Sequence, residues 1–315
     1  MKTIYFEILV NLLSIILFII GIRYISYKKQ YSFLLLLLGS YILISLIFYY
    51  IIRTHTHEEY TRYPLRTKSK IPNVIYSYWH EKPFSPLVEK CIQSWKKHNP
   101  HYTIHMITND TISTYIPFPI SRWKLATTHQ QRSDCIRLYV LSEYGGIWID
   151  ASVYLSKPLD WVHSYQYYEN SEMVGFHIGG NQKTPMVENW FFAAIPKSSF
   201  LQDWKKEFYR MHSYSTVQDY VNSVIPYINT DFIPGDLTYL TMHVACLFIL
   251  SKKRYSLSLL SAYNGPFLLV SSVRKNYIYL PILLLLCRGT EAPLLKYRQG
   301  ERKIIEGLHI TSLLP

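Results

Sequence analysis

The sequence predicts an α/β domain with a mostly parallel sheet, placed behind an N-terminal transmembrane helical hairpin. Hydrophobic residues make up 49% and charged residues 17% of the 315 residues, a balance typical of a chain with a large buried core. From residue 71 onward, strand-like segments alternate with helix-like ones, which favours a parallel sheet. Before residue 53, two long apolar stretches predict the hairpin. We expect a membrane anchor at 1–52, a polar tether at 53–70 and the main domain at 71–315.

The predicted membrane anchor consists of two apolar stretches. Tyr31–Ile52 contains no charged residue, and about twenty apolar residues suffice to cross a bilayer as a helix. Residues 4–22 form the second candidate, interrupted only by Glu7. A hairpin of both helices leaves the domain on the side of the basic segment 53–70, which the positive-inside rule places in the cytoplasm. If only one stretch spans the membrane, the domain faces the other side, as in a Golgi enzyme.

Charge and cysteine content argue against two classes of site. Nine Lys or Arg and three Glu lie in residues 1–70, so half of the net charge of +12 lies where basic residues favour anionic lipid head groups. The rest is spread along the chain without a compact basic patch, and no nucleic-acid partner is expected. The four cysteines are far apart and form no Cys-x-x-Cys pair, so neither a zinc site nor a disulfide framework is supported. Cys91 and Cys135 are predicted to be buried free thiols.

The first strand and helix of the domain have clear sequence signals. Residues 73–79 are rich in β-branched and aromatic side chains, as strands are. Ser85 followed by a proline is a typical helix start, and the apolar residues from Val88 to Trp95 recur at helical spacing. The helix should end at Asn99, and residues 102–107 form the second expected strand.

A second helix and a third strand complete the alternating pattern. The helix is expected over residues 129–143, and the pair Gly145-Gly146 should end it. Residues 147–149 then resume as a strand, with Asp150 at its carboxyl end. Ligands of parallel sheets collect at such strand ends, so Asp150 lies where a binding site is expected.

Three charged residues and one hydroxyl form the candidate chemistry. Asp134 and Arg137 lie three apart and share one face of the expected helix. Ser152 follows Asp150 by two residues and points to the same side. Carboxylate and hydroxyl oxygens suit Mg²⁺ or Mn²⁺, which commonly bridge substrate phosphates. The alternative is structural: a surface ion pair on the helix and a carboxylate in a turn.

Three motifs in a fixed order carry a family resemblance. Ile71–Ile75, Ser133–Arg137 and Tyr144–Asp150 together resemble the capsular polysaccharide synthesis family and related glycosyltransferases with an Asp-x-Asp sugar-binding region, a group similar to glycosyltransferase family 32. The resemblance covers residues 71–310. It implies a GT-A-like nucleotide-sugar-binding fold, a nucleotide-sugar donor, a glycan or polysaccharide acceptor and a divalent metal, Mn²⁺ or Mg²⁺.

The resemblance also implies roles for particular residues. Asp134 and Arg137 would hold the donor sugar, and Asp150 would bind the metal and the diphosphate. Ser152 stands where the Asp-x-Asp pattern has its second carboxylate, so the expected metal ligands are Asp150 and the weaker hydroxyl of Ser152. The full set of predicted donor-binding residues consists of Asp134, Arg137, Asp150, Tyr78, Trp79 and Gly146.

Several other polar residues have two interpretations each. Lys296 and Arg298 could bind the diphosphate, but solvated surface charge is the simpler assumption for both. Asn189 could contact the acceptor or cap the segment that follows it. His243 lies in an apolar helical run and is expected to be a core residue, whereas His309 is a candidate late metal ligand.

The sequence therefore predicts a membrane-bound enzyme that moves a hexosyl group from a nucleotide sugar to a glycan, with help from a metal. The metal would offset the charge that develops on the leaving nucleoside diphosphate. No residue is identified as a catalytic base. The alternative is a sugar-binding or scaffolding protein of the same fold without catalytic activity, an interpretation motivated by Ser152.

Overall fold

The computed structural model describes residues 59–61, 69–80, 82–180, 183–267, 280–281, 284 and 292–314. All of them belong to one compact unit, Thr56–Pro315. The predicted membrane segments, 4–22 and 31–52, lie outside the described residues, so the anchor stays a prediction. Within the described part of the chain, no helix combines the length and the apolar character needed to cross a bilayer.

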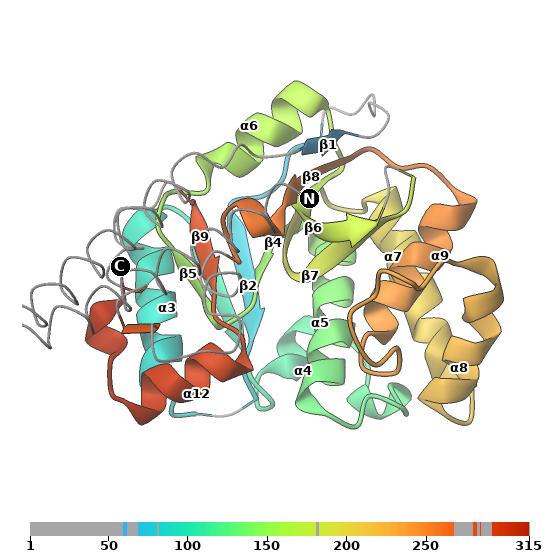
Figure 1. Ribbon diagram of the computed structural model, residues 1–315, viewed down its shortest axis with the longest axis horizontal. Helices are drawn as coiled ribbons and strands as arrows, with labels where there is room; N and C mark the ends of the chain where they lie inside the picture. The colour runs from blue at the N-terminus through green and yellow to red at the C-terminus, as the bar shows by residue number, and fades with distance from the viewer. Residues whose placement is uncertain are drawn as a thin grey trace, which may run out of the picture. The chain divides into compact units, whose positions relative to one another are not determined.

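A seven-stranded mixed sheet forms the centre of this unit, with the strand order β1-β8-β6-β7-β4-β2-β3 (Figure 1). Its strands are β1 (Glu59–Thr61), β2 (Val74–Tyr78), β3 (Thr103–Ile107), β4 (Gly146–Ile149), β6 (Met173–Gly180), β7 (Pro185–Ala194) and β8 (Leu257–Ser261). A separate two-stranded sheet pairs β5 (Val153–Leu155) with β9 (Leu294–Lys296).

The prediction of an α/β domain is confirmed, but the sheet is mixed rather than mostly parallel. Strand β2 runs parallel to β3 and β4, and β6 runs parallel to β8. The other pairs, β4 with β7, β6 with β7 and β1 with β8, are antiparallel. The physical reason is the connection of β6 to β7. The two strands follow each other directly and pair with each other, so β7 enters the sheet beside β4 in the opposite direction.

Helices cover both faces of the sheet. Figure 1 shows α5, α7, α8 and α9 on one side, and α3 and α12 with the β5–β9 pair on the other. The bounds of the helices are α3 (Pro86–His98), α4 (Ile112–Tyr115), α5 (His129–Tyr144), α6 (Asp160–Glu169), α7 (Ser199–Arg210), α8 (Val217–Val224), α9 (Thr241–Lys252) and α12 (Gln299–Gly307). Because α5 packs between the sheet and α7, nine of its residues are buried.

The local signals in the sequence placed the first elements correctly. Strands β2, β3 and β4 and helices α3 and α5 lie within one or two residues of their predicted bounds. The Ser85 hydroxyl accepts a hydrogen bond from the Val88 amide at 3.4 Å, with proline at the first helical position, as predicted. Thr128 and Gln131 form a capping box that starts α5. The thiols of Cys91 and Cys135 are buried and free, which confirms that prediction.

Part of the predicted tether belongs to the sheet. Residues Glu59–Thr61, which the sequence places in the tether at 53–70, form β1 and pair antiparallel with Ser258–Leu260. A polar composition does not prevent this, because an edge strand needs only backbone groups to satisfy its neighbour.

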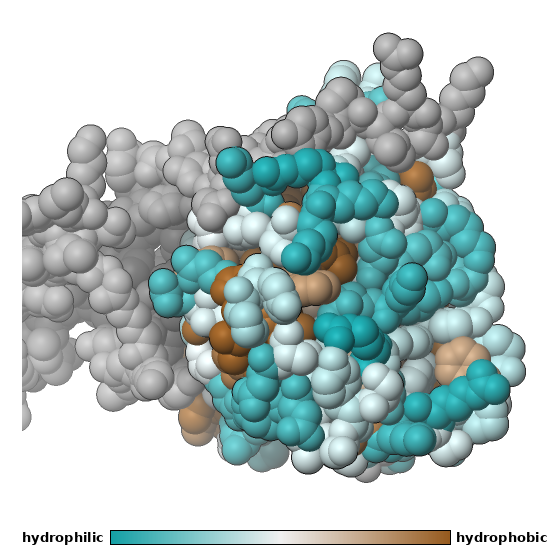
Figure 2. Space-filling view, turned by 90° about the vertical axis from the view of Figure 1, so that its right-hand side faces the viewer, coloured by the Kyte–Doolittle hydropathy of each residue, from teal (hydrophilic) through white to brown (hydrophobic). Residues whose placement is uncertain are grey.

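The outer face along α8 and α9 is polar. In Figure 2, hydrophilic and near-neutral residues cover most of it, and hydrophobic residues occupy small areas.

The pair Gly145-Gly146 connects α5 to β4 in a conformation that side chains rarely adopt. Their φ angles are +67° and +102°. A Cβ atom on Gly146 would lie 2.8 Å from the Val74 carbonyl oxygen, and one on Gly145 would lie 2.5 Å from the Pro196 nitrogen. Both contacts are with backbone, which cannot move away cheaply. The glycines therefore let α5 turn directly into β4, which places Asp134 and Asp150 on the two sides of this turn.

We expect Gly146→Ala to lower the free energy of unfolding by about 3 kcal/mol, because strain at positive φ adds to a backbone clash. Gly235→Ala is the matched control: its φ is +128°, but no atom lies within 4 Å of the added Cβ. We expect Gly235→Ala to lower the free energy of unfolding by only about 1 to 2 kcal/mol. Denaturant unfolding followed by circular dichroism measures both. Equal losses in the two variants would show that β2 does not restrict position 146.

Candidate functional site

The candidate site lies at the carboxyl ends of β2 and β4. Because Tyr76 pairs with Trp148 in the parallel register of these strands, Tyr78 and Asp150 lie at the same level of the sheet. Strand β4 ends at Ile149, and the Asp150 amide donates to the Trp190 carbonyl of β7 at 2.8 Å. The chain then turns, with the Val153 amide bonded to the Asp150 carbonyl at 2.9 Å. This turn presents the Asp150 carboxylate at the edge of the sheet.

Four side chains of alternating charge form the centre of the site. Arg137 Nη2 lies 3.3 Å from Asp134 Oδ1, and Arg137 Nη1 lies 3.3 Å from Asp150 Oδ1. Lys296 Nζ lies 2.7 Å from the other oxygen of Asp150, Oδ2. We call this set, Asp134, Arg137, Asp150 and Lys296, the charge chain. It joins α5, the end of β4 and the end of β9, so the structural alternative of a surface ion pair on the helix is wrong.

Arg137 is held from several sides and is 5% exposed. Its Nη2 donates to the Ser133 hydroxyl at 2.9 Å, and its Nη1 donates to the Asn189 carbonyl. Its guanidinium carbon lies 4.9 Å from the centre of the Trp148 ring, a cation–π contact. The indole Nε1 of the same tryptophan donates to Asp150 Oδ1 at 3.0 Å. The fixed guanidinium therefore orients both carboxylates.

Asn189 acts on the charge chain and not as a cap. It lies within β7, and its side-chain Nδ2 donates to Asp134 Oδ1 at 3.1 Å. The two interpretations from the sequence, an acceptor contact and a cap of the following segment, do not include this role, and the acceptor contact stays a prediction. Sequence position could not show the contact with Asp134, because the partner is 55 residues away on a different element.

Lys296 is buried in the charge chain, which corrects the assumption that it is solvated. Only 9% of the residue is exposed. In the small sheet β9 pairs with β5, and Lys296 lies opposite Val153, immediately after the turn that carries Ser152. Its Nζ therefore reaches Asp150 Oδ2 and also the Ser152 hydroxyl, at 3.1 Å. Arg298, by contrast, is exposed and stacks over the Phe267 ring at 4.5 Å.

The pKa values of the two carboxylates in the charge chain are shifted in opposite directions. Burial raises the pKa of Asp134 to about 7, although Arg137 opposes the rise. Burial would also raise the pKa of Asp150, but Lys296 and Arg137 together lower it below its ordinary value. For Lys296, burial lowers the pKa, and the contact with Asp150 works against that. Asp150 is therefore the firmly ionised member, while Asp134 exchanges its proton near neutral pH.

Tyr78 and Trp79 lie at the same edge of the sheet as Asp150. The Tyr78 hydroxyl donates to Asn109 Oδ1 at 2.7 Å, and the ring is buried. The partly exposed Trp79 ring lies under Arg302 of α12, 5.6 Å from its guanidinium carbon. The donor-binding role of both residues stays a prediction.

Gly146 does not lie with the other predicted donor-binding residues. It is the first residue of β4, so the strand rise places it roughly 13 Å from Asp150. The space beside its Cα is filled by Val74 and Tyr76 of β2. The structure gives Gly146 a structural role in the turn from α5 into β4, and its donor-binding role stays a prediction.

The predicted metal ligands do not fit a divalent cation in this arrangement. Asp150 Oδ1 already accepts from Trp148 and faces Arg137, and its Oδ2 is bonded to Lys296. The Ser152 hydroxyl accepts from the same ammonium. In the part of the chain that the structure describes, no three His, Cys, Asp or Glu side chains gather closely enough to hold a metal ion. His309 is exposed in the turn after α12 and does not supply the missing ligand.

Two further buried groups adjoin the charge chain. His243 of α9 is 5% exposed, which agrees with the core interpretation, and burial together with Arg137 lowers its pKa to about 4. Glu188 of β7 was not identified from the sequence. Burial raises the pKa of Glu188 to about 7, although Arg298 opposes the rise. No motif marks Glu188, since it precedes Asn189 in an otherwise apolar strand.

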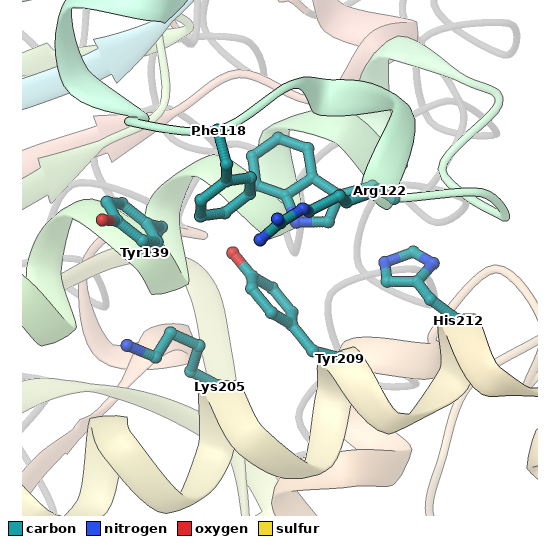
Figure 3. A pocket seen from close by; sticks show the side chains of 7 residues that line it. Phe118, Arg122, Tyr139, Lys205, Tyr209 and His212 are labelled. Carbon is teal, nitrogen blue, oxygen red and sulfur yellow. The ribbon is translucent and has the colours of Figure 1, made fainter.

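A separate pocket is lined by side chains of α5, α7, the segment before α5 and the segment after α7 (Figure 3). Its rings come from Phe118, Trp123, Tyr139, Tyr209 and His212, and its two cations lie over rings of this lining. Arg122 lies over Phe118 at 5.4 Å, and Lys205 lies over Tyr139 at 5.4 Å. None of the predicted donor-binding residues lines this pocket. We therefore place the candidate site at the charge chain.

Comparison with known proteins places the chain in a family. The family described as capsular polysaccharide synthesis protein matches residues 41–228 of the chain. O-glycosyltransferase braB of Annulohypoxylon truncatum is 25% identical over 169 residues, which cover 48% of this chain and 39% of that protein. Inositol phosphoceramide mannosyltransferase 1 of Schizosaccharomyces pombe is 25% identical over 142 residues, 42% of this chain and 41% of that protein.

The chain thus spans about two fifths of the length of these curated relatives. Among solved structures, the PaToxG glycosyltransferase aligns with 87% of this chain and 94% of its own. The TM-score is 0.35 and the identity 14%, which is too weak a likeness to bear on function. The match to the family includes Asp134, Arg137, Asp150 and Asn189 but ends before Lys296.

We expect Asp134→Asn to stabilise the protein more at pH 8 than at pH 5. The folded-state pKa of Asp134, about 7, lies above its ordinary value of 3.8. The folded state therefore holds this proton more tightly than the unfolded state does. As the pH rises from 5 to 8, the free energy of unfolding of the unsubstituted protein should fall by roughly 2 to 3 kcal/mol, and that of the variant should not. Denaturant unfolding at the two pH values measures the difference.

Glu143→Gln is the control, because the pKa of Glu143 is shifted in the opposite direction to that of Asp134. Burial opposes the ionised form, but Lys197 and Lys205 lower the pKa of Glu143 to about 2, below its ordinary value of 4.5. Its contribution to stability is complete above that ordinary value and is lost only as the pH falls toward 2. The effect of Glu143→Gln should therefore be the same at pH 5 and pH 8. A pH-independent effect of Asp134→Asn would contradict the raised pKa.

Proposed function

The chain belongs to the capsular polysaccharide synthesis protein family, and from this premise we propose that it is a glycosyltransferase. It moves a hexosyl group from a nucleotide sugar to a glycan or polysaccharide acceptor. The observation that carries the proposal is the charge chain, in which Asp134, Arg137 and Asp150 meet at the carboxyl ends of two parallel strands. The finer assignment of the fold as GT-A-like is part of the same proposal.

The charge chain has groups suited to a nucleotide sugar. Sugar hydroxyls donate hydrogen bonds to carboxylates and accept them from guanidinium groups, so Asp134 and Arg137 suit the sugar. Asp150 is the most accessible of the three, with 24% of its side chain exposed against 6% for Arg137. The donor therefore approaches from the Asp150 side. Because Arg137 is fixed by Ser133, Asn189 and Trp148, it binds without first being ordered.

The relatives support this activity by their names. One is an O-glycosyltransferase and the other an inositol phosphoceramide mannosyltransferase, and both match about half of this chain or less. A hexose is the class of sugar that the second name contains. The membrane as a partner, and a cytoplasmic or Golgi location, continue to rest on the apolar stretches 4–22 and 31–52.

A second candidate function has one specific observation in its favour. Ser152 stands where the resemblance to the Asp-x-Asp pattern implies a carboxylate, and Asp150 is already paired with two cations. A protein that binds glycans without transferring sugar could keep such a site. This candidate predicts glycan binding with no turnover of any nucleotide sugar.

We expect the purified full-length protein to release a nucleoside diphosphate from at least one nucleotide sugar in a panel of uridine and guanosine diphosphate hexoses. Asp150→Asn and Arg137→Lys should each lower kcat/KM for that donor by about 100-fold or more. A buried electrostatic contact to the reacting group commonly has an effect of this size. Release of the nucleotide, followed by chromatography, is the measurement.

Asp236→Asn makes the same chemical change at an exposed loop residue and should leave kcat/KM unchanged. Activity in Asp150→Asn equal to that of Asp236→Asn would remove Asp150 from the proposed site. Glycan binding without turnover of any donor in the panel would favour the second candidate function.

A further inference from the structure

Lys296 occupies the position between the two residues that the sequence predicts as metal ligands. Its Nζ lies 2.7 Å from Asp150 Oδ2 and 3.1 Å from the Ser152 hydroxyl. A divalent cation shared by the same two oxygens would need this position. The ammonium is held there by the pairing of β5 with β9, since the Tyr297 amide also donates to the Ser152 carbonyl at 3.0 Å.

The charges around the Lys296 ammonium are already balanced without a divalent metal ion. With both carboxylates ionised, the charge chain carries two negative and two positive charges, and protonation of Asp134 leaves it with a net positive charge. Mg²⁺ and Mn²⁺ are held in proteins mainly by carboxylates, and Asp150 offers no oxygen without a donor beside it. A cation placed here would have to displace Lys296 into a buried position without its partners, which is costly.

The ammonium keeps one donor for a ligand. A lysine has three N–H groups, and two of them are used by Asp150 and Ser152. In the described part of the chain, the third N–H has no acceptor. Lys296 can therefore bind an anionic oxygen on the Asp150 side of the site without losing its existing hydrogen bonds.

Two further cations lie near Lys296. Arg302 of α12 is close enough to lower the pKa of Lys296, and its buried Nε has no hydrogen-bond partner among the described residues. Arg298 is two residues from Lys296 and exposed. Three basic residues thus lie in one segment, and all three fall outside residues 41–228, which match the family.

From this geometry we infer that Lys296 replaces the divalent metal and binds the diphosphate of the donor, with Arg298 and Arg302 beside it. The inference rests on the proposed glycosyltransferase function. When the bond between the anomeric carbon and the phosphate oxygen breaks, the electron pair stays on that oxygen. The acceptor oxygen bonds to the anomeric carbon and releases its proton to water. The ammonium offsets the charge that develops on the leaving diphosphate.

The first test compares the binding of UDP and of GDP to the full-length protein by calorimetry, in EDTA and in added Mn²⁺. We expect the affinity for the nucleotide that binds to be the same in both within about threefold. Binding that appears only with Mn²⁺ would overturn the inference and leave the proposed function intact. Absence of binding under both conditions would overturn both. This comparison needs no substituted protein.

The second test removes the ammonium. Lys296→Met should weaken nucleotide binding in EDTA by about tenfold or more, and Lys296→Arg, which keeps the charge, should weaken it less. Lys253→Met is the matched control, because Lys253 forms an exposed ion pair with Asp203 at 2.9 Å. Unchanged affinity in Lys296→Met would contradict the inference. A stoichiometric Mn²⁺ site seen by electron paramagnetic resonance and lost in Asp150→Asn would contradict it as well.

Discussion

The ion pairs of Arg137 with Asp134 and Asp150 are the constraint on which the rest of the site depends. Removing charges from water is costly, so a buried carboxylate persists only where a cation and hydrogen-bond donors meet it. Arg137 serves two carboxylates at once, each at 3.3 Å, and Lys296 completes the set. The four groups come from α5, the end of β4 and the end of β9, so they are together only when these elements are packed.

The same packing gives the two carboxylates different exposure, different partners and different pKa values. Asp150 lies between two cations and keeps part of its surface open, whereas Asp134 lies deeper, with one cation and the Asn189 amide. Their pKa values therefore shift in opposite directions from similar ordinary values. Near neutral pH, Asp134 can therefore both donate and accept a hydrogen bond, whereas Asp150 only accepts.

The local elements were predictable because their signals are local. The cap at Ser85, the apolar stripe of α3 and the glycine pair after α5 each act within a few residues, and all were identified correctly. The mixed sheet was not predictable in the same way. Strands β6 (8 residues) and β7 (10 residues) follow each other in the chain, and only their pairing with each other and with β4 fixes their direction.

The sequence by itself determined the charged core of the site, because Asp134, Arg137 and Asp150 belong to one continuous helix–turn–strand segment. Only the tertiary structure decided what surrounds them. Lys296 meets Asp150 across 146 residues, and Asn189 meets Asp134 across 55. No pattern of residue spacing in the sequence marks such contacts, because they depend on how the strands are ordered in the sheet. For this reason the sequence predicts Ser152 as a metal ligand, whereas in the folded protein its hydroxyl accepts a hydrogen bond from Lys296.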